Sequence, residues 1–228
     1  MKSVCLIPAR GGSKRIPRKN IKSFFGKPLI SWSIETAISS GIFDEVYVST
    51  DDEEIASIAK HYGANVPFIR PENLSNDFAI DKDVIKHFIE WMESTKLFPD
   101  SLCYLYATAP FINEKTILGV QKLLKDSGAG LAHTVTSYDY PVFKALKEEK
   151  NGQIEYMWKE FANTRSQDLP ELIHDAGQCY FYNLKKFKDE EYRTVGYKIP
   201  RTQAQDIDTL EDFNQAEILF DFYLKNQY

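Results

Sequence analysis

The segment "IPARGGSKRIPRKN", residues 7–20, combines two glycines with five cationic side chains. The cations are Arg10, Lys14, Arg15, Arg18 and Lys19. A glycine-containing loop exposes backbone N–H groups, and lysine or arginine beside such groups forms charge-assisted hydrogen bonds with phosphate oxygens. The chemistry that this combination fits is the binding of a polyphosphate.

The spacing of this segment excludes two common phosphate-binding motifs. No Gly-Lys-Thr/Ser triplet follows the glycines at the distance that a P-loop needs, and the dinucleotide fingerprint GxGxxG is absent. A solvated basic loop or a localisation-type cluster is the alternative, because runs of charge are usually of that kind. The position directly after a first predicted strand favours phosphate binding.

A second group with possible chemistry lies near the end of the chain, where Asp206 and Asp208 are two residues apart in "QDIDTLED". On an extended segment, both carboxylates point to the same side and can share a hard cation such as Mg²⁺. The alternative is a helix start, with Thr209 as the cap and the aspartates near the positive end of the helix dipole. The two interpretations are compatible.

Alternating elements position these groups. Strands are predicted at 4–8, 45–50, 64–70 and 101–108, and helices at 28–40, 51–64, 81–95 and 114–128. This alternation predicts an α/β fold with a mostly parallel, Rossmann-like sheet flanked by helices. Ligands of such sheets bind beyond the carboxyl ends of the strands, where residues 9–20 emerge.

The alternating pattern changes after residue 138. Two strand-like arms flank Asn151-Gly152, a strong hairpin-turn pair, and they predict a small β-hairpin excursion from the sheet. A long amphipathic helix is predicted from Thr209, with Asp212 at capping-box spacing. We interpret residues 1–228 as a single domain and residues 136–162 as an inserted arm.

The composition excludes some classes of binding partner and indicates the cellular compartment. The net charge of -5 argues against a general nucleic-acid binder. No apolar run reaches the roughly 18 residues of a membrane helix, and the N-terminal residues lack a signal-peptide core. Three widely spaced cysteines in apolar surroundings indicate buried, reduced thiols. We therefore expect a cytoplasmic protein with no nucleic-acid or membrane partner.

The pattern A-R-x-x-S-K-x-x-x-x-K-N in residues 9–20 resembles the signature of the cytidylyltransferases that activate sialic-acid-type keto-sugar acids as CMP-sugars. The stretch "FDEVYVSTDDEEIASIAKHYGANVPFIRPENLSND" resembles a second block of that family, and "QDIDTLED" its last block. The resemblance implies the nucleotide-diphospho-sugar transferase type of fold, with CTP and an acidic nine-carbon sugar as substrates.

The resemblance also implies roles for particular residues. Arg10 and Lys19 would clamp phosphates and, with Asp208, act in catalysis. Asp206 and Asp208 would bind Mg²⁺. The nucleotide would be bound by Ala9, Arg10, Gly11, Gly12, Ser13, Lys14, Asn20 and Arg70.

Within the family, "NTRSQDLPE" and "HDAGQCYFY" are most similar to the pseudaminic acid cytidylyltransferases. Tyr106 in "LYATAP" stands where many sialate enzymes have Gln. The residues expected to meet the sugar are Tyr106, Arg165, Gln167, His174, Asp175 and Gln178. A hydrogen-bonded structural role is the alternative for His174.

Relatives dimerise through an inserted arm of this kind, so the resemblance also implies a homodimer. Three alternatives remain for the activity. The same reaction could act on N-acetylneuraminate, legionaminate or 3-deoxy-octulosonate. The chain could instead be a non-catalytic nucleotide-binding module, or an unrelated protein that interacts through its basic loop.

Overall fold

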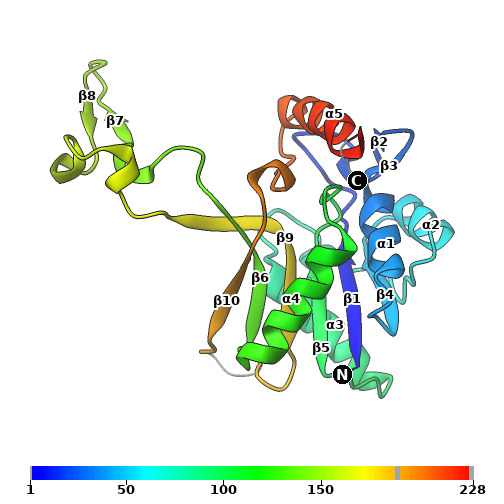
Figure 1. Ribbon diagram of the computed structural model, residues 1–228. Helices are drawn as coiled ribbons and strands as arrows, with labels where there is room; N and C mark the ends of the chain where they lie inside the picture. The colour runs from blue at the N-terminus through cyan, green and yellow to red at the C-terminus, as the bar shows by residue number, and fades with distance from the viewer. Residues whose placement is uncertain (1, 188–190, 226–228) are drawn as a thin grey trace.

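The computed structural model describes residues 2–187 and 191–225. Its centre is a six-stranded sheet in the order β10-β6-β9-β5-β1-β4 (Figure 1). The strands are β1 (Ser3–Pro8), β4 (Glu45–Ser49), β5 (Ser101–Leu105), β6 (Leu131–Ser137), β9 (Ile173–Asn183) and β10 (Thr194–Lys198).

Strand directions confirm a mostly parallel sheet. β1 runs parallel to β4 and β5, and β10 runs parallel to β6. β9 is antiparallel to both of its neighbours, β5 and β6. The strand predicted at 64–70 is wrong, because this segment makes only the isolated bridges Tyr47–Asn65 and Thr50–Ile69. Pro67 interrupts it and has no N–H to donate to a ladder.

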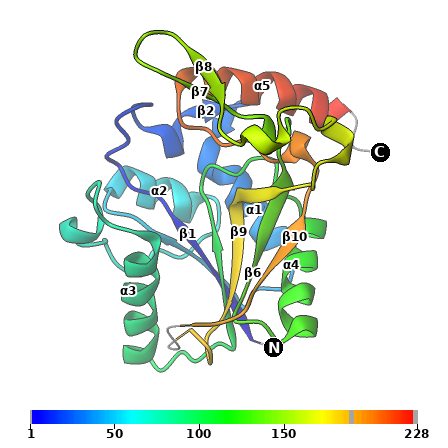
Figure 2. The same cartoon turned by 90° about the vertical axis from the view of Figure 1, so that its left-hand side faces the viewer.

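Helices cover both faces of the sheet, and Figure 2 shows α3 and α4 on opposite sides. The helices are α1 (Leu29–Ser39), α2 (Glu53–His61), α3 (Asp81–Ser94), α4 (Glu114–Ser127) and α5 (Leu210–Lys225). Apolar residues of α1, α2 and α4 pack on one face of β1, β4 and β5, and those of α3 pack on the other. Because helices pack on both faces, the carboxyl ends of β1, β4 and β5 are held in place at one end of the sheet.

Side-chain caps stabilise the first turns of α2 and α5, the helices next to these strand ends. The Oδ1 atom of Asp52 accepts from the N–H of Ile55 at 2.9 Å and caps α2. Thr209 and Asp212 form the predicted capping box at the start of α5: the Thr209 N–H donates to Asp212 at 2.7 Å, and the Asp212 N–H donates to the Thr209 hydroxyl at 3.2 Å. The box fixes the backbone immediately after Asp208.

A third apolar cluster attaches α5 to the N-terminal part of the chain. It joins Phe213 and Phe220 of α5 to Ile16, to Phe24 of the short pair β2 (Ser23–Phe24) and β3 (Lys27–Pro28), and to the buried Ile207. Because Ile207 lies between Asp206 and Asp208, packing of α5 also positions these two carboxylates beside residues 9–20.

The predicted hairpin forms from β7 (Leu146–Glu148) and β8 (Ile154–Tyr156) and projects from the sheet (Figure 1). Aromatic contacts hold its base together, with Phe143 against Trp158 and Phe161 at ring distances of 5.6 and 4.7 Å. Short 3-10 turns occur at Lys19–Ile21, Glu72–Leu74, Val142–Lys144, Lys159–Phe161, Ser166–Asp168 and Arg201–Gln203.

The three cysteines are buried and free of disulfides, as expected. Cys5 and Cys103 are register partners, and the sulfur atoms of Cys103 and Cys179 lie 3.6 Å apart. Among residues 2–187 and 191–225, no helix combines the length and the apolar character needed to cross a bilayer.

Phe220 tests the role of the third cluster. Its ring is 1% exposed and lies 5.1 Å from Phe24 and 4.7 Å from Trp32. Phe220→Ala should lower the free energy of unfolding by about 3–5 kcal/mol, because a large cavity forms. Ile218→Ala, at a position that is 73% exposed on the same helix, should change it by less than about 0.5 kcal/mol. Urea unfolding measures both, and equal effects would contradict the packing of α5.

Candidate active site

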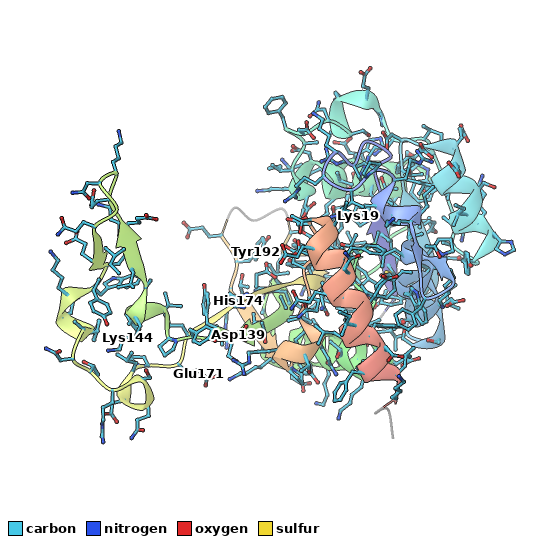
Figure 3. All side chains as sticks on the ribbon, turned by 90° about the horizontal axis from the view of Figure 1, so that it is seen from above. Lys19, Asp139, Lys144, Glu171, His174 and Tyr192 are labelled. Carbon is cyan, nitrogen blue, oxygen red and sulfur yellow. The ribbon has the colours of Figure 1, made fainter. Side chains whose placement is uncertain are left out.

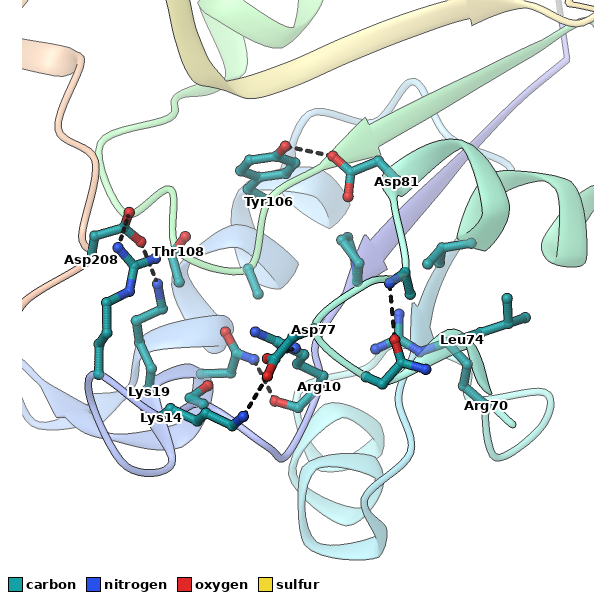
Figure 4. A pocket seen from close by; sticks show the side chains of 18 of the residues that line it. Arg10, Lys14, Lys19, Arg70, Leu74, Asp77, Asp81, Tyr106, Thr108 and Asp208 are labelled. Atoms are coloured by element: carbon teal, nitrogen blue, oxygen red, sulfur yellow. Dashed lines mark hydrogen bonds and ion pairs between the residues drawn. The ribbon is translucent and has the colours of Figure 1, made fainter. Parts of the chain in front are cut away.

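A pocket of about 440 Å³ opens at the carboxyl ends of β1 and β5 (Figure 4). Its lining comes from residues 8–20, from residues 70–84, from the end of β5 and the segment after it, and from Asp208. The lining residues are Pro8, Arg10, Ser13, Lys14, Arg15, Ile16, Lys19, Asn20, Arg70, Leu74, Asn76, Asp77, Ala79, Asp81, Val84, Tyr104, Tyr106, Ala107, Thr108 and Asp208. The pocket lies where ligands of open α/β sheets bind.

The backbone of the first loop is held in shape from inside. The buried Asn20 donates from Nδ2 to the carbonyl of Arg10 at 3.0 Å. The N–H of Gly11 donates to Oδ1 of Asp51 at 2.9 Å. Ala9 is 1% exposed and donates to the carbonyl of Ser49 at 2.9 Å. These contacts fix the loop, so its long side chains can project into the pocket.

Two of the cations share one carboxylate. Arg10 donates from a terminal guanidinium nitrogen to Oδ1 of Asp77 at 2.8 Å, and the Lys14 ammonium donates to Oδ2 of the same residue. These hydrogen bonds lower the pKa of the Asp77 carboxyl, with that from Lys14 contributing most. Figure 4 shows Asp77 between the two cations at the lower side of the pocket.

Two further cations meet at a second carboxylate. Lys19 donates to the carbonyl of Ile207 at 2.6 Å and to Oδ1 of Asp208 at 3.3 Å, and Arg15 pairs with Oδ2 of Asp208 at 2.8 Å. Four of the five cations therefore line the pocket as ion pairs. A polyanion can replace the carboxylates as their partner.

The fifth cation, Arg18, does not line the pocket. It has a left-handed backbone with φ of 58° and pairs with Asp52 and Glu54. The hydrogen bond from Arg18 lowers the pKa of the Asp52 carboxyl. Arg18 thus ties the loop to the start of α2.

The charge of Asp208 acts on the neighbouring carboxylate of Asp206, and two carboxylates in this arrangement fit a divalent cation. Partial burial, followed by the charge of Asp208, raises the pKa of Asp206, although this side chain keeps contact with solvent. Only Asp208 of the two lines the pocket. The described residues contain no cluster of three or more metal-ligating side chains. A hard cation held by one or two carboxylates takes its remaining ligands from phosphates and water, as Mg²⁺ usually does.

The other end of the pocket has a different character. Arg70 is 4% exposed, and burial lowers the pKa of its guanidinium. Its Nε donates to the Ser75 hydroxyl at 3.1 Å. Tyr104 and Tyr106 both donate to the carboxylate of Asp81, at 2.8 and 2.6 Å. The sequence did not identify Asp81 as a pocket residue, because an acidic residue is common in the first turn of a helix such as α3.

Of the residues expected to meet the sugar, Tyr106 lines the pocket and the others do not. Arg165 pairs with Asp168 at 2.7 Å beyond the arm, and Gln167 lies in the same short turn. Gln178 is 1% exposed and donates to the carbonyl of Gln203. In a single chain, these residues are therefore not brought together around the pocket.

His174 and Asp175 lie on β9 where it leaves the sheet. His174 packs against Tyr138 with ring centroids 4.7 Å apart. Asp175 accepts hydrogen bonds from the N–H of Gly177 and from the hydroxyl of Tyr180, both at 2.8 Å. Figure 3 shows His174 on the connection between the body and the arm that carries Lys144.

Comparison with known proteins gives a consistent result. A family model described as cytidylyltransferase matches residues 4–225. A pseudaminic acid cytidylyltransferase of Campylobacter jejuni subsp. jejuni serotype O:2 is 43% identical over 224 residues, which cover 96% of this chain and 97% of that protein. An N-acylneuraminate cytidylyltransferase B of Danio rerio is 32% identical over 93% of this chain and 50% of that protein.

A solved structure of a CMP:2-keto-3-deoxy-manno-octonic acid synthetase complexed with CTP shares the fold, with a TM-score of 0.70. It is 18% identical, and the match covers 98% of this chain and all of that one. The expected fold type is thereby confirmed.

Gly11 and Gly12 provide a matched test of the loop. A Cβ at Gly11 would lie 2.7 Å from Oδ2 of Asp52, whereas a Cβ at Gly12 would meet nothing within 4 Å. Gly11→Ala should therefore cost about 1–3 kcal/mol of stability, because Asp52 cannot move without losing Arg18 or the helix cap. Gly12→Ala should be neutral or stabilising by up to about 1 kcal/mol. Urea unfolding without nucleotide measures both, and similar stabilities would contradict the packing of Gly11 on Asp52.

Proposed function

This chain belongs to the cytidylyltransferase family, and we propose that it transfers CMP from CTP to the anomeric hydroxyl of pseudaminic acid, a nine-carbon keto-sugar acid, releasing pyrophosphate. The observation that carries the choice of sugar is the 43% identity, over nearly the full length of both chains, to a pseudaminic acid cytidylyltransferase. The pocket supports a nucleoside triphosphate as the donor, because four cations line it.

Charge is the main obstacle to this reaction. The hydroxyl oxygen of an anionic sugar attacks the α-phosphorus of a triphosphate and gives up its proton to the medium, and the bond from that phosphorus to the bridging oxygen of the leaving pyrophosphate breaks. Arg10, Lys14 and Lys19 face the space where this charge would lie. Fixed cations lower the barrier by stabilising charge where it develops and by holding the reacting atoms in line.

The carboxylates of Asp77 and Asp208 prepare these cations for the substrate. Each aspartate holds two cations, so the side chains are oriented before a nucleotide arrives. Binding of CTP would exchange an aspartate for a phosphate at each cation. This exchange leaves no cation unpaired.

Asp208, with Asp206 beside it, would hold Mg²⁺, which when bound supplies positive charge to phosphate oxygens. Release of Asp208 from Arg15 and Lys19 would free its oxygens for the cation. Arg15 and Lys19 would then turn to the phosphates. The role of Asp208 in catalysis is thus to exchange partners between the free and the bound states.

The sugar would be bound by Tyr106 in the pocket together with residues of β9 and the segment before it: Arg165, Gln167, His174, Asp175 and Gln178. Arg165 offers a planar guanidinium, which suits the sugar carboxylate. Since Arg165 lies near the arm rather than in the pocket of its own chain, we propose that the site is completed in a homodimer.

The surface of the arm supports this dimer. Tyr140, Ile154 and Met157 are 84%, 61% and 58% exposed on or beside the hairpin. Exposed apolar side chains on a projecting arm favour a surface that a protein covers. Three free, buried thiols agree with a reducing compartment, and we propose the cytoplasm.

Pyrophosphate release tests the proposed function. The protein is incubated with CTP, Mg²⁺ and one acid at a time: pseudaminic, N-acetylneuraminic, legionaminic or 3-deoxy-octulosonic. Release should be fastest with pseudaminic acid, should yield a CMP-sugar by mass, and should stop on chelation of the metal. Asp208→Asn should lower the rate at least about 100-fold, since electrostatic stabilisation is lost.

Another preferred acid would contradict the choice of sugar but keep the reaction. No release with any acid, from protein that still binds CTP, would favour a non-catalytic nucleotide-binding module.

The solution mass tests the dimer. The chain should have about twice its own mass of 26.3 kDa by light scattering. The double variant Ile154→Asp with Met157→Asp should be a monomer, because two charges would be buried without partners in the contact. Ile218→Asp, at an exposed apolar position on α5, should remain a dimer. A monomeric wild-type protein would contradict the proposal.

A further inference from the structure

The pocket lining contains two chemically different groups of side chains. Arg10, Lys14, Arg15 and Lys19 form one group and fit a triphosphate. A second group in the lining consists of Arg70 and Asp81 together with the side chains of Leu74, Val84 and Tyr104. If the triphosphate lies on the four cations, this second group is left for the base of the nucleotide, and it offers one donor and one acceptor beside apolar side chains.

Asp81 is held firmly as an acceptor. Its Oδ1 accepts from the Tyr104 hydroxyl at 2.8 Å, and its Oδ2 accepts from the Tyr106 hydroxyl at 2.6 Å. Each carboxylate oxygen has two lone-pair sites, so both oxygens keep one site for a further donor. Asp81 is exposed to the open pocket. Figure 4 shows its carboxylate beside Tyr106 at the edge of the space that the pocket encloses.

The partners of Asp81 distinguish it from the other carboxylates of the pocket. Asp77 is held by Arg10 and Lys14, and Asp208 by Arg15 and Lys19. Within the part of the chain that the structure describes, Asp81 is the pocket carboxylate held by neutral hydroxyls. Its charge is therefore not neutralised by an ion pair, and it remains available to a ligand that donates a hydrogen bond.

Arg70 supplies the complementary group. A guanidinium can only donate, and its Nε is already used by Ser75. The terminal nitrogens remain for acceptors. Burial has the largest effect on the pKa of Arg70 and lowers it. Tyr104, Asp51 and Arg10 have smaller effects, and the charge of Asp81 raises the pKa by the least of these. The charges of Arg70 and Asp81 therefore act within one site.

We propose that Asp81 selects cytosine over uracil by accepting a hydrogen bond from the exocyclic amino group, while Arg70 donates to the acceptor atoms of the same base. This inference rests on the proposed function. Cytosine carries a donor at N4, and a carboxylate is the natural acceptor for it. Uracil carries an acceptor oxygen at the same place. That oxygen would face a carboxylate oxygen with no hydrogen between them, which leaves two acceptors unsatisfied.

The test compares kcat/KM for CTP and UTP with the same sugar acid, and the affinities of both nucleotides by calorimetry without the acid. The wild-type enzyme should prefer CTP in both measurements. Asp81→Asn should lower the CTP-to-UTP ratio about 10- to 100-fold, because the amide can donate to the uracil oxygen. Asp81→Ala should also lower the ratio, through weaker CTP binding alone, and it serves if Asp81→Asn does not fold.

Two controls separate base selection from structural effects. Asp83→Asn removes the same charge from the same first turn of α3, at a residue that does not line the pocket. It should keep the CTP-to-UTP ratio. Tyr104→Phe removes one hydrogen bond to Asp81 but keeps the carboxylate, and it should also keep the ratio whatever its effect on the overall rate.

An unchanged ratio in both Asp81 variants would overturn the inference, and so would an equal loss in Asp83→Asn. A raised KM for the sugar acid at an unchanged ratio would assign Asp81 to the acceptor instead. Failure of the proposed function is distinguishable, because the wild-type enzyme would then release no pyrophosphate. The calorimetric ratio would still decide the role of Asp81 in that case.

Discussion

The site depends on the pairing of cations with carboxylates at the carboxyl ends of the sheet strands. Four lysine and arginine side chains project from one short loop into one pocket, and without partners they would repel each other. Asp77 and Asp208 each hold two of them. Exposed ion pairs contribute little to stability, typically about 0.2–1 kcal/mol each, so a triphosphate can replace the carboxylates at small cost. The pairs therefore orient the cations without trapping them.

The fold brings two carboxylates that are far apart in the sequence to the loop of residues 9–20. Asp77 follows β4 and α2, and Asp208 comes from nearly the end of the chain. The second of these depends on α5, since Phe213, Phe220 and Ile207 share one apolar cluster with Ile16 of the loop. The capping box at Thr209 then fixes the turn of the backbone after Asp208. Packing far from the pocket thus decides which groups meet in it.

Local sequence signals predicted what depends on local physics. The alternation of strands and helices, the turn at Asn151-Gly152 and the capping box at Thr209 follow from periodicity and turn chemistry, and all three occur in the structure except for the strand predicted at 64–70. Tertiary pairing could not be predicted in the same way. Asp77 and Asp81 read as ordinary loop and helix-start acids, and their roles appear only when residues 70–84 fold against β1 and β5. Gln178 shows the reverse: an amide expected at the sugar is buried against Gln203.

The most direct test of this account is the affinity of Asp77→Asn for CTP with Mg²⁺, measured by calorimetry at two salt concentrations. If a phosphate replaces Asp77 at Arg10 and Lys14, the variant should bind CTP about threefold to tenfold more tightly, since two exposed ion pairs no longer compete. Asp83→Asn carries the same change in net charge and should bind as the wild type does. Weaker binding by Asp77→Asn would contradict the account, because Asp77 would then hold the cations in place in the bound state as well.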